Sequence, residues 1–101
     1  MVFNSVTSTT DIESTGFALY QNRPNPFGSE TVIPFYLQSA SHTVLKIADV
    51  SGKTLKVLEG NFSGGDHQFK INASDLPTEG VFFYTLETQH GTAVKKMILQ
   101  R

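Results

Sequence analysis

The sequence predicts an all-β sandwich of six or seven short strands. From residue 31 onward apolar residues alternate with a period of two, which is the period of a half-buried strand. Turn signals rich in Gly, Asn, Asp and Pro separate these runs about every eight to twelve residues. No segment keeps the helical period for three turns. The 101 residues, 39% of them hydrophobic, suffice for one domain with one modest core, since about 60% of the unfolded surface is buried at this size.

The N-terminal residues 1–16 form a polar leader rich in Ser and Thr. Such a segment buries too little apolar surface to offset the entropy lost on ordering, so we expect a flexible linker. The folded domain is expected to span residues 17–101. Its first anchor, residues 17–20, is predicted to pair as an edge strand.

A proline-rich segment, residues 19–27, follows this anchor. Pro24 and Pro26 fix φ and remove two backbone donors, so the segment cannot join the middle of a sheet. We expect a stiff, extended strap that ends at Phe27 and pins the linker against the sandwich.

The next strands are expected at residues 31–37, 44–49 and 55–58. Pro34 lacks an N–H group, which suggests that the first of these strands has an open edge. Gly52 supplies the positive φ of a tight turn that joins the other two into a hairpin.

Three further strands complete the pattern. Residues 67–73 alternate cleanly after a loop at residues 61–66. Residues 81–86 are apolar on both faces, which predicts a central strand covered on two sides. A strand at residues 93–99 closes the domain.

Composition excludes several classes of function. The formal net charge is −1, so there is no basic field to attract nucleic acid. No window approaches the apolar length of a membrane span. The first residues lack the features of a signal peptide, so an exported chain is expected to be a piece of something longer. There is no cysteine, which rules out disulfides and thiol chemistry.

No catalytic or metal-binding constellation is evident, and no cofactor is expected. His42, His67 and His90 stand at predicted loops or strand ends without partners at ligand spacing. Asp49 and Asp66 sit beside glycine turns without the repeated oxygen ligands of a calcium loop, so Asx-type turns are favoured.

Two surface features leave alternatives open. The pair Lys95 and Lys96 on the last strand suits either edge protection against aggregation or recognition by a partner. An adhesive or carbohydrate-binding sandwich of a cell-surface protein needs exposed aromatics, for which Phe62 and Tyr36 are candidates.

An ordered set of segments carries a resemblance to a known family. The set comprises residues 19–27, 31–37, 45–53, 65–67, 76–84 and 95–99. It resembles the type A C-terminal sorting domain of proteins exported by the type IX secretion system of Bacteroidetes-type bacteria. The flagellar hook-capping sandwich shares the aromatic strand but has a Trp-Asp-Gly-type turn, whereas this chain has no tryptophan.

The residues that match the family's signal positions fall along the whole domain. They are Pro24, Asn25, Pro26, Phe27, Gly52, Lys53, Gly80, Tyr84, Lys95, Lys96, Met97 and Leu99. The chain departs from the family at Arg23 and Ala48, where an aromatic and a tyrosine are common.

The resemblance implies a non-catalytic immunoglobulin-like sandwich of about seven strands at the end of a larger cargo. Such a domain directs its cargo through the periplasm and across the outer membrane to the cell surface or the medium. The implied partners are an outer-membrane shuttle protein, the translocon and a sortase-like peptidase that cleaves the domain off and attaches the cargo to the surface. We expect that cut before Phe17, and we expect the open edge of the last strand to bind a receptor by strand addition.

Overall fold

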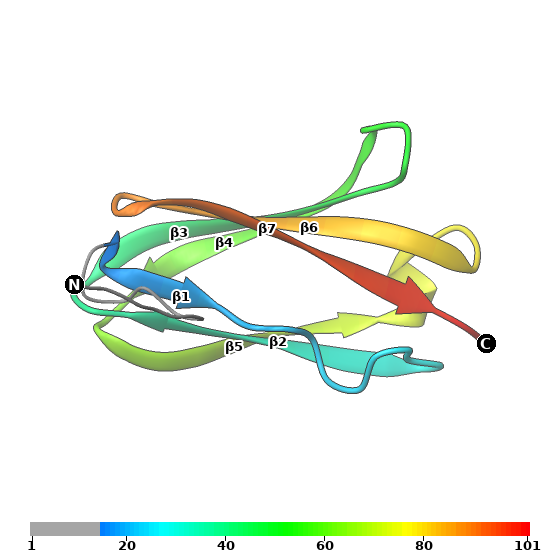
Figure 1. Ribbon diagram of the computed structural model, residues 1–101, viewed down its shortest axis with the longest axis horizontal. Helices are drawn as coiled ribbons and strands as arrows, with labels where there is room; N and C mark the ends of the chain where they lie inside the picture. Colours follow the sequence, from blue (N-terminus) through cyan, green and yellow to red (C-terminus); the bar gives the residue numbers. More distant parts are fainter. Residues whose placement is uncertain (1–14) are drawn as a thin grey trace, which may run out of the picture.

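The computed structural model describes residues 15–101 and consists of two antiparallel sheets packed face to face (Figure 1). The seven strands are β1 (Phe17–Leu19), β2 (Glu30–Leu37), β3 (Ser41–Ala48), β4 (Thr54–Phe62), β5 (Gly65–Asn72), β6 (Gly80–Thr88) and β7 (Gly91–Leu99). A short 3₁₀ turn, η2 (Ala73–Asp75), joins β5 to β6. This architecture confirms the predicted immunoglobulin-like all-β sandwich. Most of the predicted linker, residues 1–14, lies outside the described residues.

One sheet has the order β1-β2-β5 and the other the order β4-β3-β6-β7. The core lies between them and is built from alternate residues of each strand, as the period of two dictates. The alternate side chains that fill the core include Ile33, Phe35, Leu37, Leu45, Ile47, Phe69, Ile71 and Ala73, all buried. Within the described residues no helix is long and apolar enough to cross a membrane.

The expectation that Pro34 marks an open edge is wrong, because β2 lies between β1 and β5. The Pro34 carbonyl accepts a hydrogen bond from the Tyr20 N–H at 3.1 Å, just past the end of β1. In an antiparallel strand the nitrogen and carbonyl of one residue point to the same side. The missing N–H therefore faces Tyr20, the first residue after β1, and the Tyr20 carbonyl accepts from the Tyr84 hydroxyl at 2.8 Å. A central strand tolerates proline there because the Tyr84 hydroxyl supplies the donor.

The aromatic strand β6 is central, as predicted, but it is covered on one face only. Phe82, Tyr84 and Leu86 are buried in the core, while Val81 and Phe83 are exposed on the outer face. Nothing in the described chain packs over that outer face, since all the elements on this side belong to the same sheet.

The hairpin between β3 and β4 rises away from the sandwich (Figure 1, green). Gly52 has φ of 92°, which confirms the predicted positive φ in its turn. The strand β4 extends to Phe62, so the loop expected at residues 61–66 is reduced to two residues between β4 and β5.

Candidate functional site

The proline-rich segment connects the two sheets. Arg23 exchanges two backbone hydrogen bonds of 2.9 Å with Val32 of β2, in the first sheet. Phe27 forms a parallel bridge with Leu99 of β7, in the second sheet. Between these points residues 24–26 form bends. The expected straight, extended strap is therefore wrong: the segment turns across the gap between the sheets because its two ends are bonded to different layers.

The strap occupies the edge of β7 over its C-terminal half. The Phe27 N–H donates to the Ile98 carbonyl at 3.0 Å, and the Ile98 N–H donates to Asn25 Oδ1 at 2.9 Å. Further along the edge, Gln21 Nε2 donates to the Lys96 carbonyl at 2.7 Å. The prediction that this part of the last strand offers a free edge for strand addition is therefore wrong. We call residues 21–27 of the strap and the part of β7 that they cover (residues 96–99) the seam.

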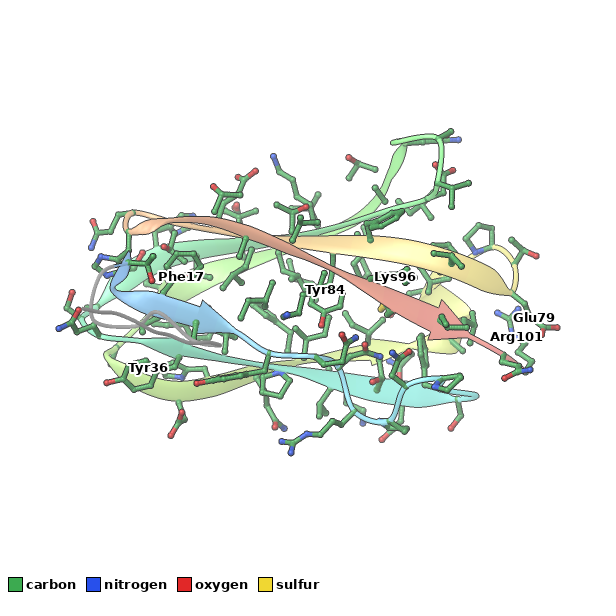
Figure 2. The ribbon with its side chains drawn as sticks, in the orientation of Figure 1. Phe17, Tyr36, Glu79, Tyr84, Lys96 and Arg101 are labelled. Atoms are coloured by element: carbon green, nitrogen blue, oxygen red, sulfur yellow. The ribbon has the colours of Figure 1, made fainter. Side chains whose placement is uncertain are left out.

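A buried polar network binds the strap on its core-facing side. Asn22 is 1% exposed, and its backbone N–H donates to the Tyr84 hydroxyl at 2.9 Å. That hydroxyl donates in turn to the Tyr20 carbonyl at 2.8 Å. The Asn22 amide donates to Thr31 Oγ1 and to the Pro24 carbonyl, both at 3.1 Å. Tyr84 lies between the two sheets (Figure 2), and this burial raises its pKa to about 12.

This network was missed from the sequence. Asn22 lies in the proline-rich segment, but nothing in its local context distinguishes a buried asparagine from an exposed turn residue. Its partner Tyr84 is 62 residues away. Only the folded chain brings the two together.

The seam collects most of the residues that match the family's signal positions, and their burial divides them into two groups. The buried group comprises Phe27, Tyr84, Met97 and Leu99. The exposed group comprises Pro24, Asn25, Pro26 and Lys96, with Gly80 exposed opposite Leu99. The buried residues contribute to the core, and only the exposed residues are accessible at the surface.

Lys95 and Lys96 point to opposite faces of β7. Lys95 pairs with the inward-facing Tyr84 and is half-buried, while Lys96 pairs with Phe83 on the outer face and is exposed. The two lysines therefore do not form a single charged patch. Only Lys96 extends the outer surface of the sheet.

Gly52 and Lys53 lie apart from the seam, at the tip of the β3–β4 hairpin. The Asp49 carboxylate accepts hydrogen bonds there from the hydroxyl and N–H of Ser51, at 2.6 and 2.9 Å, and from the Lys53 N–H at 3.0 Å. These bonds, the Ser51 hydroxyl first, lower the pKa of Asp49 below 3.8. The Asx-turn interpretation of Asp49 is confirmed.

The far end of β7 is tied to the opposite loop. The Arg101 guanidinium donates to the carbonyls of Ala73 and Leu76 at 3.0 and 3.3 Å, and its backbone N–H donates to Glu79 Oε1 at 3.1 Å (Figure 2). These bonds fix the direction in which β7 leaves the seam.

The remaining candidates belong to the core or stand alone. Phe62 packs edge-on against Phe35 and Phe69, with ring centroids 5.3 and 5.4 Å apart, so it is not an exposed aromatic platform. The His67 ring lies against this cluster. Among the described residues no group of three His, Cys, Asp or Glu is placed to hold a metal ion.

These features define the class: a small β-sandwich domain whose N-terminal strap is locked onto its last strand. A family model described as a secretion system C-terminal sorting domain matches residues 23–100. The chain therefore belongs to the C-terminal sorting domains of the type IX secretion system. It is a sorting signal from a non-catalytic family, which implies export that ends at the cell surface or in the medium.

Among solved structures the chain is similar to dimeric latent PorU from Porphyromonas gingivalis. The TM-score is 0.65 at 18% identity, and the match covers 82% of this chain but only 9% of that chain. At this identity the likeness establishes the fold alone. No curated protein matches the chain.

Proposed function

We propose that residues 17–101 carry a cargo, joined through the linker at residues 1–16, across the outer membrane by the type IX pathway. On this proposal the cargo passes through the periplasm, where an outer-membrane shuttle protein recognises the folded domain and delivers it to the translocon. The family membership supports the pathway. The observation that carries the proposed recognition is the seam, where both ends of the domain form one surface.

Recognition then depends on a folded shape rather than on a linear peptide. Phe27 is buried in the core and anchors the strap, so Pro24 to Pro26 are held at fixed positions beside Lys96. A partner that reads this surface reads the exposed prolines, the Asn25 side chain and the Lys96 ammonium together. Loss of Tyr84 or Leu99 would act on recognition indirectly, because it would release the strap.

The domain is then cleaved from its cargo before Phe17, by a sortase-like peptidase that attaches the cargo to the cell surface. From Gly16 onward the backbone is part of the fold: the Gln38 N–H donates to the Gly16 carbonyl at 2.8 Å, and β1 pairs with β2. Proteases act on accessible chain that is not hydrogen-bonded, so the cut is expected on the N-terminal side of residue 16.

The test is a reporter with a signal peptide fused in front of residues 1–101, expressed in a type IX-competent host and in a matched host without the system. We expect the reporter at the surface of the first host only, with a new C-terminus before residue 16 by mass spectrometry. Retention of the intact fusion in the periplasm of the competent host would contradict the proposal. Deleting residues 95–101 is a poor test, because it also removes the buried Met97 and Leu99.

A further inference from the structure

The exposed large apolar side chains of the described chain all lie on one side of the sandwich. They are Val50 (73% exposed), Val57 (49%), Val81 (36%), Phe83 (39%) and Val94 (60%). Each belongs to β4, β6, β7 or the β3–β4 hairpin. The outer face of the β1-β2-β5 sheet carries none of them. An apolar surface confined to one face is typical of an interaction site, whereas scattered single residues are not.

Strand register places Val81 and Val94 near Phe83, whereas Val57 lies two strands away, opposite Lys46 of β3. Phe83 pairs with Ala48 of β3 on one side and with Lys96 of β7 on the other. Val81 precedes Phe83 by two residues and Val94 precedes Lys96 by two, so both point to the same outer face. We call Val81, Phe83 and Val94 the outer apolar face.

Among the described residues, the charge beside Phe83 that has no ion pair is positive. Lys46 is paired with Glu87, with Nζ and Oε2 3.1 Å apart. Within residues 15–101, Lys96 and Lys53 have no ion pair. Lys96 adjoins Phe83 in the sheet, and Lys53 stands at the tip of the hairpin that continues from Ala48.

We propose that the outer apolar face is the surface by which this domain docks on a protein of the secretion machinery. The matching surface of that protein has an apolar centre, which covers Phe83, and carboxylates that meet Lys96 and Lys53. The inference rests on the proposed sorting function and adds the docking face and the chemistry of the partner. It also gives Lys53, at the exposed hairpin tip apart from the seam, the same role as Lys96, which is to meet a carboxylate of the partner.

An anionic bilayer surface and a second copy of this domain are the other occupants, and the test below separates them from a partner protein. The family membership implies contact with the secretion machinery, which favours a partner protein that meets Lys96 with carboxylates.

The test uses matched substitutions on the two outer faces of the same fusion protein. Phe83→Thr removes the exposed ring but keeps a strand-forming residue, and Tyr36→Thr is its counterpart on the half-buried outer face of β2. Lys96→Glu reverses a charge beside Phe83, and Lys70→Glu reverses a charge on β5, where it also removes the 3.3 Å ion pair with Glu30. We expect at least about a tenfold loss of surface delivery for the first member of each pair, because truncating a central aromatic anchor commonly has an effect of this size. The β1-β2-β5 variants should retain delivery within about twofold.

Thermal unfolding of each variant shows whether it folds, and a variant that unfolds is replaced by Val94→Thr on the outer apolar face. Normal delivery of a folded Phe83→Thr fusion, or an equal loss with Tyr36→Thr, overturns the docking face. Two further results would also overturn the proposal, because each assigns the face to another occupant. One is a dimer, detected by sedimentation, that Phe83→Thr abolishes. The other is binding to phosphatidylglycerol vesicles that Phe83→Thr abolishes. If the unaltered fusion is not delivered at all, the sorting function itself fails, and the two failures are thus distinguishable.

Discussion

Replacing Tyr84 with Phe tests whether the buried network holds the strap. The substitution keeps the ring in the core and removes one oxygen. That oxygen accepts from the Asn22 N–H at 2.9 Å and donates to the Tyr20 carbonyl at 2.8 Å. Asn22 is 1% exposed, so water cannot replace the lost acceptor.

An orphaned buried donor costs roughly 1–3 kcal/mol, so we expect Tyr84→Phe to lower the free energy of unfolding by about 2 kcal/mol. For a domain of this size that loss corresponds to a fall in melting temperature of roughly 8–16 °C. The assay is thermal unfolding by circular dichroism, with urea unfolding to check that the slope m is unchanged.

Tyr36→Phe is the control. Tyr36 lies on the outer face of β2, and its hydroxyl has no hydrogen-bond partner among residues 15–101. Its loss should change stability by less than about 0.5 kcal/mol. If Tyr84→Phe is as stable as Tyr36→Phe, the Asn22 network does not hold the strap and the reasoning is refuted.

Three further predictions concern ionisation and the seam. The pKa of Tyr84 is raised to about 12, so its contribution to the free energy of unfolding should be complete below about pH 10. Between about pH 10 and pH 12 that contribution should fall by roughly 1.4 kcal/mol per pH unit. A decline of the same slope in Tyr84→Phe would refute this. The pKa of Asp49 is lowered from 3.8, so its carboxyl carbon signal should titrate below 3.8 by NMR. Its contribution to stability should be present above pH 3.8 and be lost as the pH falls through the lowered pKa. Titration at or above 3.8 would count against the turn. Asn25→Ala removes the acceptor of the Ile98 N–H and should cost about 1 kcal/mol, with faster amide exchange at Ile98; unchanged exchange there would mean that the strap is held without Asn25.

The strands were predictable because each depends on neighbours in sequence. Alternation over residues 31–37 and 67–73 places the same side chains inward whatever strand lies beside them. The turn at Gly52 is equally local, since a positive φ and the Asp49 bonds involve five consecutive residues.

The seam and the outer apolar face were not predictable in this way. The bond between Gln21 and the Lys96 carbonyl joins residues 75 apart, and no local pattern shows which strand edge receives the strap. The apolar composition of β6 was correctly read as a central strand. Which face is covered depends on the layers around it, so the exposure of Phe83 follows only from the sheet order.

The most direct test of the sorting function compares two fusions in one type IX-competent host. One reporter carries residues 1–101 and the other carries residues 1–16 alone. We expect the first at the cell surface and the second in the periplasm, because the folded domain with its seam is the signal. Surface delivery of the second fusion, or periplasmic retention of the first, would contradict the account.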